Sequence, residues 1–211
     1  MTSVCSAVVN RPLSLLLAAI LSVAALATAA HAAPSSQQPG TPGTPGTTGV
    51  TVKGSTIIRL DKTLFTRFTR AGGKLRAGKP AKATKTGAKF KVTSIALGSD
   101  GASYLLKHKG SLRLSTTEDV VTIANPTASI DPTTGSGVMT ATLSGKRVKV
   151  ASLQIDIGNL EQTGSGIIAD NVDLKMTARL ASELNRLLGT TFLTEGSTLG
   201  KASVNVVTDP S

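Results

Sequence analysis

The sequence predicts an all-β fold, an antiparallel β sandwich-like domain with two short α-helices. The first reason is an apolar content of 40%, which is enough for a packed core and comes mainly from Val, Ile, Leu and Ala. The second is that Thr, Ser and Gly surround short segments in which apolar and polar residues alternate, as they do in strands. The third is the abundance of turn formers, with 21 Gly and 9 Pro in 211 residues.

The strand alternation recurs from residue 88 onward, and its apolar phase changes at two places. The first change falls between Val92 and Ile95, within one expected strand. The second falls between Val150 and Leu153. One extra residue in a strand shifts the phase in this way, so we predict a β-bulge near Ala151-Ser152.

Two segments have helical periodicity instead. Residues 61–71 predict a short helix that ends at Gly72-Gly73. The second helix ends at Gly189 and has apolar residues at i, i+4, i+7 and i+8, namely Leu180, Leu184, Leu187 and Leu188.

The chain divides into three expected parts. Residues 1–32 have the charged start, apolar centre and small-residue cleavage site of a signal peptide, residues 33–52 form a Pro/Gly/Thr-rich linker, and residues 53–211 form the β domain. Cleavage would remove the single Cys5, so we expect no disulfide in the mature chain. We therefore expect a secreted protein, extracellular or associated with the cell wall, with no transmembrane anchor after cleavage.

The net charge of +11 comes from one basic segment, residues 53–91, which holds twelve Lys or Arg and one acid. From residue 92 to the end, ten basic residues face eleven acidic ones. Adhesion to an anionic cell-wall polymer is one interpretation of this segment. A solvated surface loop is the other. Nucleic acid is not an expected partner, because no aromatic side chains are interleaved to stack bases and the protein is exported.

Few side chains could carry catalysis, so we expect a non-enzymatic protein without catalytic residues or a protein-held metal ion. The mature chain offers one histidine and no cysteine. Asp170 and Asp173 are expected on opposite faces of a strand.

The remaining candidates for ligand binding are Tyr104 and His108, which a strand places on one face but about 13 Å apart. At most one of them could ligate an iron. A histidine between lysines is otherwise commonly a surface residue.

Several motifs together resemble the HtaA (haem-transport-associated) domain family over roughly residues 55–208. In chain order they are Leu106-x-His108-x-Gly110-Ser-Leu112-x-Leu114, an Asn-Pro pair with strand-turn-strand through Ala141-x-Leu143, Leu184-Asn185-x-x-Leu188-Gly189, Phe192, and Gly196-x-x-Leu199-Gly200-x-Ala202. The resemblance implies a secreted or surface-displayed bacterial domain with a twisted antiparallel β fold and short helices. It also implies haem as the candidate cofactor.

In haem-binding members of that family a tyrosine in the early helix ligates iron, and a histidine in a Gly-His-x-Gly segment hydrogen-bonds that tyrosine. Here Phe68 stands at the tyrosine position and His108 at the histidine position, with Lys107 in place of the first glycine. Phe cannot coordinate iron, so the implied site lacks its anionic ligand.

We therefore expect an HtaA-like binding or surface-associated module derived from haem acquisition. Its candidate ligand-binding residues are Phe68, Tyr104 and His108. One alternative is a genuine haem- or small-ligand-binding protein that uses His108 or Tyr104. Another is cell-wall polymer adhesion through the basic segment 53–91.

Overall fold

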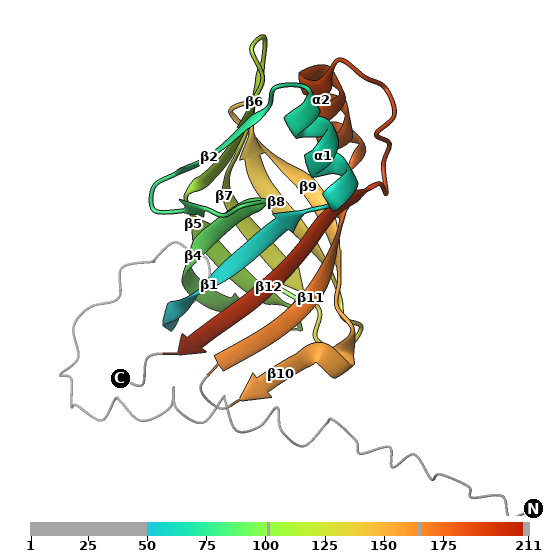
Figure 1. Cartoon of the computed structure of the whole chain (residues 1–211). Helices are drawn as coiled ribbons and strands as arrows, with labels where there is room; N and C mark the ends of the chain where they lie inside the picture. Colours follow the sequence, from blue (N-terminus) through green and yellow to red (C-terminus); the bar gives the residue numbers. More distant parts are fainter. Residues whose placement is uncertain (1–49, 101, 164–165, 209–211) are drawn as a thin grey trace, which may run out of the picture. The chain divides into compact units, whose positions relative to one another are not determined.

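The computed structural model describes residues 50–208 except 101, 164 and 165 (Figure 1). The chain separates into two units, residues 1–43 and 44–211, and all described residues belong to the second. The expected signal peptide and most of the expected linker therefore lie outside the described residues and stay predictions. Within the described ranges, no helix has the length and apolar character needed to span a membrane.

Strands dominate the described residues, and two α-helices and one 3-10 turn interrupt them. The elements in chain order are β1 (Val50–Leu60), α1 (Lys62–Arg70), β2 (Lys74–Gly78), β3 (Lys82–Ala83), β4 (Gly87–Leu97), β5 (Tyr104–Lys109), β6 (Ser111–Ser115), β7 (Val120–Ile130), β8 (Ser136–Leu143), β9 (Lys146–Gln154), η3 (Ile157–Asn159), β10 (Leu160–Thr163), β11 (Gly166–Met176), α2 (Ala178–Leu188) and β12 (Thr198–Thr208).

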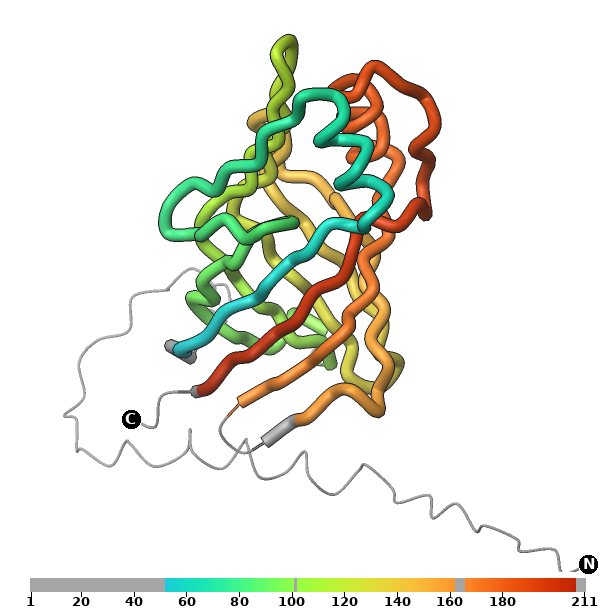
Figure 2. The backbone as a smooth tube through the Cα atoms, in the orientation of Figure 1, coloured from blue at the N-terminus to red at the C-terminus, as the bar shows by residue number. Residues whose placement is uncertain are grey.

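All of these strands pair antiparallel in a single sheet that closes on itself. Eight strands form the closed ring in the order β7-β5-β4-β1-β12-β11-β9-β8, because β7 also pairs with β8. β6 pairs with β7 beyond the end of β5, and β2 pairs with the other edge of β6. Two short strands add to the ring, because β3 pairs with β4 and β10 pairs with β11. The start of β1 lies beside the end of β12, as the backbone trace shows (Figure 2).

The all-β class, the antiparallel pairing and the two helices confirm the sequence prediction, but the sandwich-like arrangement is wrong. One barrel-like closed sheet takes the place of two packed sheets. Both arrangements bury one face of every strand, so they produce the same alternation of apolar and polar residues. Closure depends on which edge strands meet, and the alternation carries no information about that.

Bulges bend the strands of the closed sheet. The predicted bulge near Ala151-Ser152 is confirmed at Val150, which is the extra residue where β9 pairs with β8. In β4 the phase change is caused by Thr93. This residue lies between Val92 and Ser94, which are opposite consecutive residues of β5, so Thr93 is the extra residue. β7 and β11 have bulges at Asn125 and Asn171, whose φ values are 47° and 56°.

The β11 bulge corrects one expectation about acidic residues. Ala169 and Val172 are both buried although they are three residues apart. Asp170 and Asp173 therefore both lie on the outer side of the sheet, not on opposite faces. Asp173 forms an exposed ion pair with Lys201 at 3.4 Å between Oδ1 and Nζ. Such a pair is typical of a solvated surface and contributes little stability.

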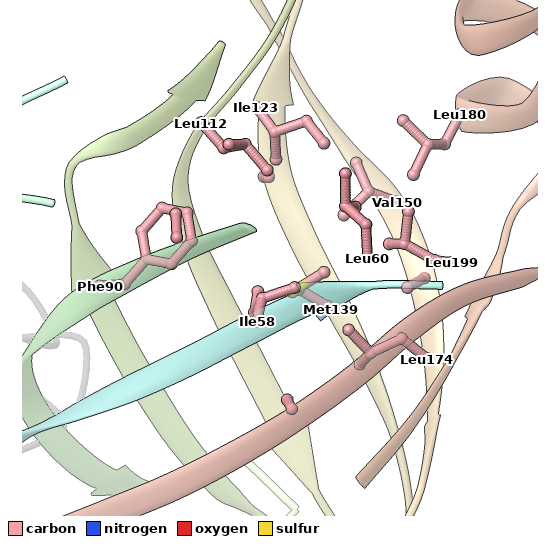
Figure 3. Close-up of a cluster of buried hydrophobic side chains, with 14 of the residues drawn as sticks. Ile58, Leu60, Phe90, Leu112, Ile123, Met139, Val150, Leu174, Leu180 and Leu199 are labelled. Carbon is pink, nitrogen blue, oxygen red and sulfur yellow. The ribbon is translucent and has the colours of Figure 1, made fainter. Parts of the chain in front are cut away.

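The core fills the interior of the closed sheet (Figure 3). Ile58, Met139 and Leu174 are among the buried side chains that point inward from the strands. α1 and α2 lie at the same end of the sheet (Figure 1). Leu180 of α2 is fully buried and lies near Val150 of β9 (Figure 3). α2 thus covers one end of the apolar interior.

α1 lies within the predicted residues 61–71, and α2 ends at Gly189 as predicted. α1 starts after Asp61, whose Oδ1 accepts hydrogen bonds from the backbone N–H groups of Thr63 at 2.8 Å and Leu64 at 3.1 Å. α2 starts after Thr177 and ends at Gly189, which has the left-handed φ of 60° that favours glycine at a helix C-terminus.

Replacing Asp61 with Ala is expected to destabilise the domain by about 1 kcal/mol, because two backbone N–H groups at the start of α1 lose their acceptor. Asp61→Asn keeps an oxygen at the same position and should change the free energy of unfolding by only a few tenths of a kcal/mol. Urea denaturation of both variants checks this. Equal losses in the two variants would mean that the cap does not stabilise α1.

The middle of the basic segment is not the solvated loop that one interpretation expected. Lys74–Gly78 forms β2 and pairs with β6, and Lys82–Ala83 forms β3 and pairs with β4. Leu75 and Ala77 of β2 are partly buried against the core. The apolar residues between the cations are few, so the strand character depends on a partner strand that is distant in sequence.

Candidate functional site

The interior around His108 is the strongest candidate site. Leu106 and His108 of β5 are buried, whereas Lys107 and Lys109 are exposed. Tyr104 lies on the same inner face, as predicted from the strand pattern. His108 is only 6% exposed, so its interpretation as a surface residue is wrong.

Hydrogen bonds fix both the orientation and the proton position of the His108 ring. Its Nδ1 lies 3.0 Å from the carbonyl oxygen of Pro126. A carbonyl can only accept, so Nδ1 carries the proton and donates it there. Nε2 is then the acceptor for the hydroxyl of Thr56, at 2.7 Å. Phe90 completes the surroundings with an edge-on ring contact, at 6.5 Å between ring centres.

Burial keeps His108 uncharged. The loss of solvent around the ring lowers the pKa of His108 from 6.5 to about 4. The hydrogen bond to the Pro126 carbonyl favours the protonated ring, but its effect is smaller than that of burial. A neutral imidazole whose Nε2 lone pair points inward is the form that can ligate a metal. Here that lone pair already has Thr56 as its partner.

Three strands and one bulge bring these groups together. Thr56 of β1 lies opposite Phe90 of β4, and His108 of β5 lies opposite Val92 of the same strand. His108 therefore reaches Thr56 across the inner side of β4. On the other side of β5, the β7 bulge begins at Asn125 and presents the carbonyl of the next residue to the ring.

Two small cavities border this region. The cavity beside His108 has a volume of about 30 Å³, and the cavity beside Tyr104 has about 20 Å³. Leu106, Ile130 and Val204 contribute to the walls of both. Each holds about one or two water molecules at most. Pockets for drug-sized ligands and cofactors usually measure hundreds of Å³, so neither cavity accepts a haem in this conformation.

Phe68 does not belong to this group. It is buried on α1 with 2% exposure, and its ring packs over Gly73, where an added Cβ would lie 2.4 Å from the ring atom Cε2. It lines neither cavity. The structure thus does not bring the three candidate ligand-binding residues together in one site. Tyr104 and His108 share a face but border different cavities, and Phe68 packs separately.

The partners of His108 have no distinguishing signal in the sequence. Phe90 lies in an expected strand but has no feature that distinguishes it from other core positions, and no strand was expected at Thr56. Pro126 was noted only as part of the Asn-Pro pair in the HtaA-like motifs. Among the described residues, no group of three or more His, Cys, Asp or Glu side chains could hold a metal ion.

Solved structures with this arrangement exist. The C-terminal domain of HtaA from Corynebacterium glutamicum matches with a TM-score of 0.61 and 17% identity, over 76% of this chain and 98% of that domain. The fold is that of an HtaA domain. The N-terminal domain of the same protein matches with a TM-score of 0.58 and 14% identity, over 77% of this chain and 99% of that domain.

A third structure, a domain-swapped dimer of a histidine-to-alanine variant of the HtaA C-terminal domain, matches with a TM-score of 0.52 and 16% identity. It covers 71% of this chain and 92% of that one. These similarities confirm the HtaA resemblance at the level of the fold. No protein-family model and no curated protein sequence matches this chain.

Proposed function

We propose that this chain is a non-enzymatic, exported HtaA-like domain that acts as a binding or surface-associated module derived from haem acquisition. One observation carries the proposal: the HtaA fold is combined with a closed interior at His108. The imidazole Nε2 accepts a hydrogen bond from Thr56 beside a cavity of about 30 Å³. Position 68, where the resemblance implies the iron ligand, holds a buried phenyl ring.

These features weaken a haem site in two separate ways. An iron-binding tyrosine contributes an anionic oxygen, which Phe68 lacks. A ligand of haem size also needs space that the closed sheet does not offer without rearrangement. The proposed module therefore keeps the scaffold of a haem-acquisition domain and has lost, or never had, strong haem binding.

The wild-type protein is accordingly expected to bind haem weakly or not at all in a titration followed by absorbance. Phe68→Tyr restores the phenol at the position where the family supplies it and should bind haem more tightly than wild type. Phe65→Tyr is the matched control, because it adds the same group to α1 at a different, partly buried position.

Three results would contradict this account. Tight wild-type binding that His108→Ala abolishes would mean that the histidine site holds haem in its own right. Equal gains in Phe68→Tyr and Phe65→Tyr would mean that the added phenol acts without regard to position. No gain in Phe68→Tyr would reject the placement of the family tyrosine at residue 68.

A second candidate is a small-ligand site that uses His108 or Tyr104. The supporting observation is the neutral Nε2 of His108, because burial lowers its pKa to about 4 and leaves a lone pair beside a cavity. A small ligand would have to displace the Thr56 hydroxyl from Nε2. The same titration carried out on His108→Ala and Tyr104→Phe assigns any wild-type binding to one of the two cavities.

A further inference from the structure

The outer side of the sheet brings like charges directly opposite one another on neighbouring strands. The register places Lys91 of β4 opposite Lys109 of β5. It also places Lys82 of β3 opposite Lys89 of β4. On the extension of the sheet, the same holds for two arginines, with Arg76 of β2 opposite Arg113 of β6.

All six of these side chains are exposed, and among the described residues none has a carboxylate partner. Strands β1 to β6 are described throughout and contain no Asp or Glu. Figure 1 shows β2, β4 and β5 along one side of the sheet. We name this outer surface the basic face and define it by six residues: Arg76, Lys82, Lys89, Lys91, Lys109 and Arg113.

The three strand pairs are continuous with one another. The turn between β2 and β3 packs on the junction between β5 and β6, since a Cβ at Gly110 would lie 2.6 Å from Ala81. Gly110 has a φ of 109°, which glycine tolerates readily. This close approach links the arginine pair to the lysine pairs.

Like charges directly opposite each other on a sheet are destabilising, so the basic face does not serve folding. We propose that the basic face binds a flexible linear polyanion that lacks aromatic bases. The Cβ atoms of residues directly opposite each other on neighbouring strands lie about 5 Å apart, and alternate residues along a strand lie about 6.6 Å apart. An extended chain of regularly spaced anionic groups matches such an array better than a single compact anion does.

The composition of the face decides against nucleic acid. Recognition of single strands combines a basic groove with aromatic side chains on which bases stack. The aromatic residues of β1 to β6 are Phe90 and Tyr104, and both point into the sheet. Four of the six cations are lysines, which act as mobile point charges and lack the planar fork of arginine. Phosphate or carboxylate polymers without bases remain as the chemistry that fits.

This inference deepens the surface-association part of the proposed function and does not depend on haem. It also corrects the limits of the basic segment. Lys109 and Arg113 belong to the half of the chain that is nearly neutral in sequence, yet pairing places them beside cations of residues 53–91.

The test measures binding of the purified chain to two immobilised probes, linear polyphosphate and polygalacturonate. The site variant is Lys91→Gln/Lys109→Gln. The control variant is Lys146→Gln/Lys149→Gln, which removes the same charge from exposed positions on β9, on the other side of the closed ring. We expect the site variant to lose about tenfold or more in affinity at low salt, and the control variant to lose much less.

Thermal unfolding without polymer gives the second readout. The site variant should unfold at the same or a higher temperature than wild type, because a repulsive pair has been removed. Loss of binding with unchanged or raised stability supports the proposal. Equal losses of affinity in the site variant and the control variant would mean that binding depends only on net charge. That result would overturn the proposal. Tighter binding of single-stranded oligothymidylate than of either base-free polymer would overturn the assigned partner. Failure to bind any of the probes would overturn the proposal itself, while the haem titration would still test the proposed function separately.

Discussion

Phe90→Ala is expected to lower the free energy of unfolding by about 3–5 kcal/mol. The ring is 1% exposed, lines the cavity beside His108 and contacts the imidazole edge-on. Truncation removes the transfer free energy of the ring and leaves a larger void in a closed sheet whose strands cannot easily collapse around it. A loss of this size is a large fraction of the 5–15 kcal/mol that stabilises a typical domain.

Phe192→Ala is the matched control for this prediction. Phe192 is 39% exposed, and the guanidinium group of Arg67 lies 3.9 Å from its ring centre. Its truncation should cost under about 1 kcal/mol. Urea denaturation curves of the two variants and wild type give the comparison. Similar losses for Phe90 and Phe192 would show that Phe90 is not part of a tightly packed interior.

Acidification is expected to destabilise the folded domain between pH 6.5 and about 4, by on the order of 3 kcal/mol across that interval. Burial holds the pKa of His108 at about 4, against 6.5 in the unfolded chain. Below pH 6.5 the unfolded chain therefore binds a proton that the folded domain does not. Stability from this residue is complete above pH 6.5, falls as the pH drops through the interval and levels off below about 4.

His108→Asn isolates this effect, because asparagine does not titrate. The difference in unfolding free energy between wild type and the variant should depend on pH within the interval. Hydrogen bonds lower the pKa of Asp100, Asp119 and Asp131, with backbone donors leading for the first and third and Arg186 for the second. The stability that these three carboxylates contribute is lost only as the pH falls from about 3.8 downward, which is below the interval assigned to His108. A pH-independent difference would mean that His108 is accessible to solvent or already charged.

Local sequence patterns determined much of the fold. Alternation indicated strands from residue 88 onward but not β1, β2 or β3, the spacing of apolar residues indicated both helices, and Gly189 marked the end of α2. Phase changes predicted irregularities that lie at Thr93 and Val150. Such features depend on neighbours within a few residues, so they can be predicted from the sequence without a structure. The order of the motifs also predicted the HtaA fold.

The candidate site was only partly accessible to the same reasoning. The strand period placed Tyr104 and His108 on one face, because that relation is local. It could not say that the face is closed off from solvent. The flanking lysines even suggested a surface position for His108, whereas the tertiary structure buries the ring against Thr56 and the Pro126 carbonyl.

Only the tertiary structure decided which strands meet. β7 pairs with β8 as well as with β5, and this one additional contact turns an open sheet into a closed one. The same long-range pairing sets Lys91 opposite Lys109 and Arg76 opposite Arg113, so that one basic face forms from two differently charged halves of the chain. The reason is that alternation fixes the two faces of a strand but not its neighbours, which depend on packing of the whole interior.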